Sequence, residues 1–139
     1  MASITILVID DQEETLDLIR EALQAKGREI LTFNCPIQAL RETEDRHLDI
    51  VLTDLRMPNI SGLEVLTEVK SRSPETEVIV LTGHGGVEAA VEAMKKGATD
   101  FFTKPLRMVE FTKGVEKLIE LQTMRGRLLL ALGEAQASY

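Results

Sequence analysis

The sequence has a single cysteine, Cys35, among its 139 residues, so an internal disulfide is excluded. Its apolar runs are too short to span a bilayer. The first residues lack the basic stretch and apolar segment of a secretory signal. The two histidines and the lone cysteine do not stand at the spacing of a zinc site. We therefore expect a cytoplasmic protein with no membrane segment.

The sequence also has fewer basic residues than acidic residues. The chain has 16 Lys and Arg residues against 23 Asp and Glu residues, and its net charge is -7. Phosphate backbones and anionic lipid surfaces would repel such a chain, so we expect no direct binding of nucleic acid or membrane by this segment. Internal repeats and low-complexity tracts are absent from the sequence. With 44% hydrophobic residues, the length fits one globular domain with a proper core.

Short apolar runs alternate along the chain with segments whose apolar residues recur at helical spacing. The runs are residues 4–9, 29–33, 48–54, 77–82 and 99–103. Runs of Ile, Val and Leu without polar alternation are typical of strands buried on both faces of a parallel sheet. In the fourth helical segment we expect an apolar stripe of Val87, Ala90, Val91 and Met94 to face the sheet, and the last helix begins near Met108. Because parallel neighbours need crossover connections, the pattern predicts a three-layer α/β fold with five helices and five strands.

Polar residues with chemical potential stand where the predicted strands end. They are Asp10, Asp11, Asp54, Thr82 and Lys104. In an open α/β sheet the carboxyl ends of the strands face the binding crevice. The fold would therefore collect three carboxylates, a hydroxyl and an ammonium group at one edge of the sheet.

Such a cluster needs positive charge. Two carboxylates about 4 Å apart repel by roughly 4 kcal/mol at an effective dielectric constant of about 20. A divalent ion with hard oxygen ligands suits the three aspartates, and Mg²⁺ is the ion that keeps some waters and shares a phosphate. If Asp54 acted as a nucleophile toward a phosphoryl group, the metal and Lys104 would offset the charge and Thr82 could donate a hydrogen bond.

These residues, in this order, resemble the receiver domains of response regulators in two-component signalling. The resemblance rests on Asp10-Asp11, on Asp54 before Leu55-Arg56-Met57-Pro58, on Thr82-Gly83 and on Lys104-Pro105. It extends from Ile4 to about Leu118. It implies a doubly wound (βα)5 flavodoxin-like fold with sheet order 2-1-3-4-5, and a phosphorylation-controlled signalling switch.

The resemblance also implies the chemistry of the site. Asp54 would accept a phosphoryl group from the phosphohistidine of a sensor histidine kinase. The protein would assist its own phosphotransfer and autodephosphorylation and would not otherwise be an enzyme. The Lys104-Pro105 peptide bond would be cis. The implied Mg²⁺ ligands are Asp10, Asp11, Asp54 and the backbone carbonyl of Arg56.

Further roles follow from the same resemblance. Thr82 and Lys104 would bind the phosphoryl group. Thr82 and Phe101 would be the switch residues that relay its presence to an output or to a dimer interface. Arg56 and His84, each two residues beyond Asp54 or Thr82, would modulate the lifetime of the phosphoryl group.

The chain continues beyond the expected receiver domain, which we place at residues 1–120. Residues 121–139 are predicted to form a helical extension or linker. Its residues Leu121, Met124, Leu128, Ala131 and Ala135 have the 3-4-3-4 spacing of a two-helix coiled coil, although Gly126 and Gly133 weaken the helix. We expect a homodimer, with a frayed linker to an output domain as the alternative. The extension and the Thr-Gly-His-Gly loop resemble receivers of nitrogen-regulator-like ATPase transcription activators.

Three other functions compete with the phosphorylated switch. A pseudo-receiver that acts only as an interaction module would not need the acidic residues together with Thr82 and Lys104. A stand-alone aspartyl-phosphate phosphatase would need a second Asp two residues beyond the nucleophile, where the chain has Arg56. A flavodoxin-type cofactor protein is poorly served by three carboxylates facing an anionic cofactor.

Overall fold

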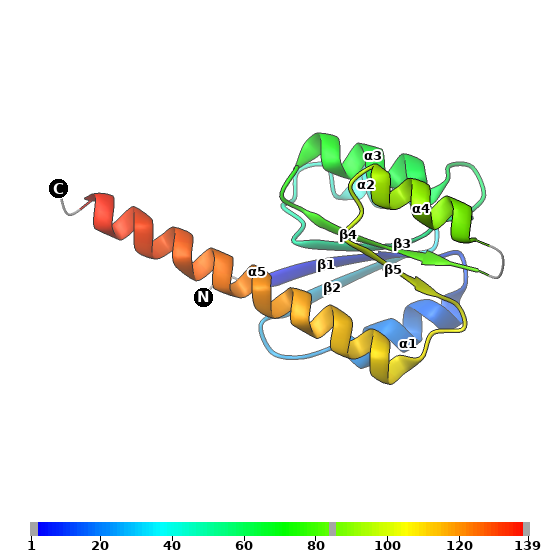
Figure 1. Cartoon of the computed structure of the whole chain (residues 1–139), viewed down its shortest axis with the longest axis horizontal. Coiled ribbons are helices and arrows are strands. Elements are labelled where there is room, and N and C mark those ends of the chain that lie inside the picture. The colour runs from blue at the N-terminus through cyan, green and yellow to red at the C-terminus, as the bar shows by residue number, and fades with distance from the viewer. Residues whose placement is uncertain (1–2, 84–85, 138–139) are drawn as a thin grey trace.

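Five parallel strands form one sheet in the order β2-β1-β3-β4-β5 (Figure 1). The structure is a computed structural model that describes residues 3–83 and 86–137. The strands are β1 (Ile4–Ile9), β2 (Arg28–Phe33), β3 (Ile50–Asp54), β4 (Glu77–Thr82) and β5 (Asp100–Thr103). The helices are α1 (Glu13–Leu23), α2 (Pro36–Glu42), α3 (Gly62–Arg72), α4 (Val87–Lys95) and α5 (Met108–Ala137). The predicted fold class and sheet order are confirmed, although β3 begins two residues later than the apolar run that predicts it.

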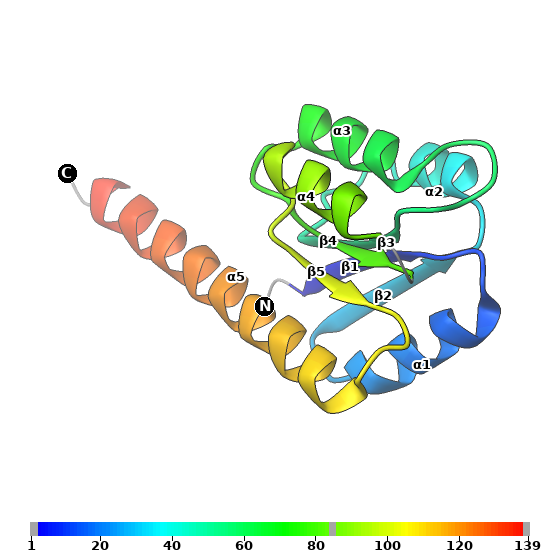
Figure 2. The same cartoon turned by 45° about the vertical axis from the view of Figure 1, so that its right-hand side comes forward.

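Each face of the sheet has its own layer of helices. α1 and α5 cover one face, and α2, α3 and α4 cover the other (Figures 1 and 2). Alternate residues of each strand supply the two cores. In β1, Ile6 and Val8 pack toward α1 and α5, whereas Leu7 and Ile9 pack toward the opposite layer. Burial of the strand on both faces explains why its sequence is apolar without alternation.

The predicted inward stripe of α4 is wrong in part. Of its four members only Ala90 is buried, while Val87, Val91 and Met94 are exposed. The second buried residue of α4 is Ala93, three residues after Ala90 and therefore on the same side of the helix. The helix turns its small residues toward the sheet, and its larger apolar residues remain at the surface.

α5 is a single helix of 30 residues that extends well beyond the sheet (Figure 1). Phe111, Val115 and Ile119 pack it against the core. Gln122 Nε2 then donates to the carbonyl oxygen of Asp49, the residue before β3, at 3.3 Å. The helix passes residue 120 without a break, so the division between the receiver and the extension stays a prediction. None of the helices within the described ranges is long and apolar enough to cross a membrane.

Gly114 lets α5 approach the ring of Phe102 on β5. A Cβ at position 114 would lie 2.8 Å from Phe102 Cζ. That ring packs edge-to-face on Phe111, with 5.2 Å between the ring centroids. Gly126, in the same helix, would place a Cβ where no described atom other than its chain neighbours and the helix's own backbone lies within 4 Å. Substitutions at the two glycines therefore distinguish the cost of overpacking against Phe102 from the intrinsic preference of a helix for alanine over glycine.

We predict that Gly114→Ala lowers the melting temperature and that Gly126→Ala raises it. Overpacking against Phe102 should cost about 1–3 kcal/mol. Replacing an open helical glycine by alanine should gain up to about 1 kcal/mol. Thermal unfolding followed by circular dichroism measures both. An equal rise in melting temperature for both variants would show that Phe102 does not limit the approach of α5.

Candidate functional site

Asp54 is the last residue of β3, and its side chain is almost fully buried. The chain returns close to it, because the N–H of Gly62 donates to the carbonyl oxygen of Leu55 at 3.0 Å. A Cβ on Gly62 would lie 2.7 Å from Leu55 Cα and closer still to the carbonyl oxygen of Asp54. Only glycine allows α3 to begin against the end of β3. Sequence reasoning missed this role of Gly62, since the close approach involves two separate segments.

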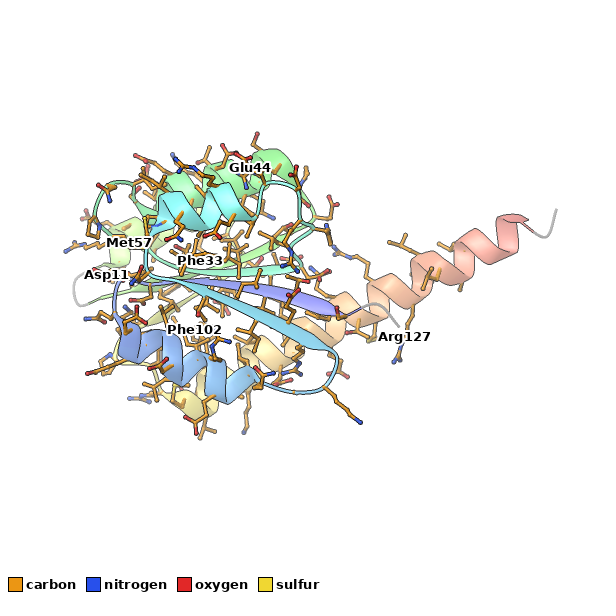
Figure 3. The ribbon with its side chains drawn as sticks, turned by 180° about the vertical axis from the view of Figure 1, so that it is seen from behind. Asp11, Phe33, Glu44, Met57, Phe102 and Arg127 are labelled. Carbon is orange, nitrogen blue, oxygen red and sulfur yellow. The ribbon has the colours of Figure 1, made fainter. Side chains whose placement is uncertain are left out.

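Asp10 and Asp11 follow β1, the strand beside β3 in the sheet. Asp10 is fully buried, and its Oδ1 accepts a hydrogen bond from the backbone N–H of Gln12 at 2.9 Å. Asp11 is exposed at the same end of the molecule as Met57, in the loop after β3 (Figure 3). Carboxylate oxygens of Asp10, Asp11 and Asp54 lie within 4.8 Å of one another. The predicted acidic cluster is therefore assembled by the fold.

The ammonium group of Lys104 lies among these carboxylates. Its Nζ donates to Asp54 Oδ2 at 3.0 Å and lies 2.6 Å from Asp10 Oδ2. The second contact has the distance of an ion pair but not the angles of a hydrogen bond, so Asp10 Oδ2 has no aligned donor among the described residues. The peptide bond between Lys104 and Pro105 is cis. Lys104 directly follows β5, and its ammonium group contacts Asp10 and Asp54.

Burial and charge act in opposite directions on this pair. Burial raises the pKa of Asp10 above its usual value, because the carboxylate loses hydration, while the Lys104 ammonium and the Gln12 N–H lower it in part. Burial alone would lower the pKa of Lys104, but the negative charges of Asp10 and Asp54 and the hydrogen bond to Asp54 outweigh it and raise that pKa. Lys104 therefore stays protonated at neutral pH. Its contribution to stability is present below the ordinary lysine pKa and is lost only as pH rises through the raised value.

Thr82 ends β4 with its side chain buried. Its carbonyl oxygen accepts a hydrogen bond from the backbone N–H of Lys104 at 2.7 Å, which joins the ends of β4 and β5. Gly86, the residue before α4, lies so close that a Cβ there would stand 2.9 Å from Thr82 Cβ. Glycine at position 86 preserves the space of the threonine side chain, a requirement that sequence reasoning also missed.

The remaining predicted residues lie around this centre. Arg56 is exposed, and its backbone N–H donates to Asp54 Oδ1 at 3.3 Å. Phe101 lies on β5 opposite Val80 of β4, and its side chain is 39% exposed. His84 lies outside the described residues, so its proposed role as a modulator stays a prediction. The fold brings the three aspartates and Lys104 together, with Thr82 at the next strand end.

The donor set fits Mg²⁺. Three carboxylates supply hard oxygen ligands within one small space. Asp10 Oδ2 is buried without an aligned hydrogen-bond donor in the described part of the chain, and a cation would stabilise it. The burial that raises the pKa of Asp10 favours a positive partner for the same reason. Asp10, Asp11 and Asp54 are the side chains that would hold the ion.

The doubly wound sheet, with three aspartates and Lys104 gathered at the carboxyl ends of its strands, indicates the class of the protein. The model of the response regulator receiver domain family matches residues 6–116. The chain belongs to this family, whose members are the phosphorylation-controlled domains of two-component signalling and generally bind Mg²⁺ at an acidic pocket.

The relatives point in the same direction. The chain is 36% identical over 120 residues to the regulatory protein AtoC of Escherichia coli (strain K12), covering 86% of this chain and 26% of AtoC. It is 33% identical over 114 residues to the DNA-binding transcriptional regulator NtrC of the same organism, covering 82% of this chain and 24% of NtrC. The chain therefore spans about a quarter of these relatives.

A solved structure shows how closely the fold agrees. A crystal structure of a response regulator receiver domain protein from Clostridium thermocellum superposes with a TM-score of 0.78 at 36% identity. The match covers 91% of this chain and 98% of that protein. The structural match therefore extends over nearly the full length of both proteins.

We predict that Mg²⁺ raises the melting temperature of the unphosphorylated protein. An ion that binds only the folded state at a hundredfold excess over its dissociation constant stabilises by about 2.7 kcal/mol, which corresponds to roughly 5–10 °C for a domain of this size. Asp11→Asn should remove most of the gain without disturbing the fold, because Asp11 is exposed. Asp45→Asn, an exposed carboxylate in the loop before β3, is the matched control and should keep it. An unchanged melting temperature in wild-type protein at saturating Mg²⁺ would contradict a metal site.

Proposed function

We propose that the chain is a phosphorylation-controlled switch whose Asp54 takes a phosphoryl group from the phosphohistidine of a sensor histidine kinase. A carboxylate oxygen of Asp54 attacks phosphorus, the P–N bond breaks, and the departing imidazole nitrogen takes a proton from solvent. Bound Mg²⁺ would neutralise charge on the phosphoryl oxygens. The transfer needs no further catalytic residue from the receiver, so its part is to position and to stabilise charge.

The placement of the Lys104 ammonium is the observation that carries this proposal. Its Nζ is 3.0 Å from Asp54 Oδ2, within reach of any group attached to that oxygen. Thr82 lies at the neighbouring strand end, and its hydroxyl can donate to a second phosphoryl oxygen. A pseudo-receiver would have no use for a partly buried ammonium beside a buried carboxylate, because removing charges from water costs free energy.

The relay that we propose runs from Thr82 to Phe101. The two residues lie on the paired strands β4 and β5. The backbone N–H of Lys104 links the ends of these strands by donating to the Thr82 carbonyl oxygen. Phe101 is partly exposed, as are Val91 and Met94 on α4. A shift of Thr82 toward a phosphoryl group would therefore alter an apolar surface formed by α4 and β5. Arg56, exposed next to Asp54, is proposed to modulate the lifetime of the phosphoryl group together with His84.

Intact-mass measurement after incubation with acetyl phosphate and Mg²⁺ tests the phosphoacceptor. We expect a gain of one phosphoryl group in the wild-type chain and none in Asp54→Asn. Asp45→Asn, remote from the acidic cluster, should behave as wild type. Modification that persists in Asp54→Asn, or wild-type protein that stays unmodified, would contradict the proposal.

The switch is proposed to act in a homodimer joined through the extension of α5. The side chains of Leu121, Met124 and Leu128 are between 53% and 59% exposed, and they lie on one side of the helix. If Leu121 and Leu128 take position a of the heptad and Met124 takes d, Glu120 falls at g and Arg125 at e. In a parallel dimer these two residues of opposite copies form an ion pair, which favours that orientation and register. Ala131 continues the seam, and Ala135 lies beyond the described side chains.

The similarity to NtrC suggests the output. That relative is named a DNA-binding transcriptional regulator, and the matched segment is about a quarter of it. We propose that this receiver and its extension control a nitrogen-regulator-like transcription activator. The net charge of -7 keeps the receiver itself away from DNA.

Light scattering tests the dimer at micromolar concentration. We expect a dimer for the full chain and a monomer after truncation at Glu120. Leu128→Glu places a charge in the seam and should also give a monomer. Leu130→Glu lies about 160° away around the same helix and should remain dimeric. A monomeric full chain, phosphorylated or not, would make the extension a linker.

A further inference from the structure

Gln12 begins α1 without capping it. The residue has extended backbone angles (φ -101°, ψ 113°), and in the described chain its side chain makes no hydrogen bond to the helix backbone. Ser, Thr, Asp and Asn are the residues that normally cap a helix, and glutamine is not one of them. Its Oε1 instead accepts hydrogen bonds from Lys104 Nζ and from Thr15 Oγ1, both at 3.4 Å. The side-chain oxygen of Gln12 thus contacts Lys104 and does not cap the helix.

Three oxygens surround the Lys104 ammonium among the described residues. They belong to Asp10, Asp54 and Gln12, at 2.6, 3.0 and 3.4 Å from Nζ. An ammonium has three N–H donors and no acceptor, so the amide group of Gln12 must turn its oxygen toward it. Two of the three oxygens are carboxylate oxygens of the acidic cluster that would hold a divalent cation. The ammonium and the cation therefore compete for Asp10 and Asp54, and Gln12 supplies the third, uncharged acceptor.

We propose that Gln12 is a positioning residue that holds the Lys104 ammonium while Mg²⁺ takes the carboxylates, and that it thereby strengthens Mg²⁺ binding. The inference rests on the Mg²⁺ site of the proposed function. An open cavity of about 470 Å³, with Gln12, Gly83 and Lys104 among its lining residues, offers the lysine head group room to shift toward Gln12. Loss of the amide oxygen would leave the ammonium on the carboxylates, where it opposes the cation.

A neutral amide suits this role better than a carboxylate. A charged acceptor would form a stronger, charge-assisted bond with Lys104. That bond would keep the ammonium from a phosphoryl group on Asp54. The neutral amide oxygen accepts the same N–H in a weaker hydrogen bond. Lys104 can therefore leave Gln12 once the phosphoryl group arrives.

Titration calorimetry of the unphosphorylated full-length chain with Mg²⁺ tests the inference by a binding readout. Gln12→Met keeps the length of the side chain and removes its oxygen, and we expect the dissociation constant to rise about threefold to tenfold. Lys104→Met should lower it. In the Lys104→Met background, Gln12→Met should have no further effect, because its action passes through the ammonium. Gln12→Glu, which restores an acceptor oxygen, should bind Mg²⁺ at least as tightly as wild type.

Gln24→Met is the matched control, since this exposed glutamine stands at the opposite end of α1. It should leave the dissociation constant unchanged. Equal Mg²⁺ affinity in wild type and Gln12→Met would overturn the inference and leave the proposed function intact. A loss of affinity that persists in the Lys104→Met background would also overturn it, because Gln12 would then act on the metal directly. Wild-type protein that binds no Mg²⁺ would overturn the metal site of the proposed function and the inference with it.

Discussion

The repulsion among three carboxylates is the constraint on which the rest of the site depends. Asp10 and Asp54 are buried where their charge is costly, and Asp11 adds a third charge within 4.8 Å. The ammonium of Lys104 is the positive group that the described residues place among them. Any change in charge at Asp54 must therefore move Lys104, a cation or both. A phosphoryl group on Asp54, as proposed above, would force such a site to rearrange, since the group adds charge where charge is already hard to accommodate.

Much of this could be predicted from the sequence because parallel sheets impose a simple rule. Asp10, Asp54 and Thr82 each stand at the end of a mostly apolar run, and the carboxyl ends of parallel strands meet at one edge. Burial of strands on both faces made those runs easy to recognise. The prediction for α4 was wrong in part because helical periodicity identifies only that a helix has an apolar side. It does not show whether Ala90 and Ala93 or the larger Val91 faces the sheet.

Three residues of the site that sequence reasoning missed depend on a close approach between distant segments. Gly62 and Gly86 have meaning only beside the backbone of Asp54 and the side chain of Thr82. The role of Gln12 depends on its contact with Lys104, which is far from it along the chain. A single sequence shows a glycine or a glutamine in a loop and gives no measure of what lies opposite. These residues show that the site is shaped by absent side chains and by neutral ones as well as by its charges.

The unbroken course of α5 turns the extension into a lever. Its core residues Phe111 and Val115 are embedded beside the sheet, whereas residues 122–137 project about 24 Å along the helix axis. A tilt of about 10° at the core would move the far end by roughly 4 Å, a distance comparable to the rise of nearly three helical residues. Packing changes too small to alter the fold of the receiver would thus be amplified where the helix ends. The stiffness of the helix determines how much of such a displacement reaches residue 137.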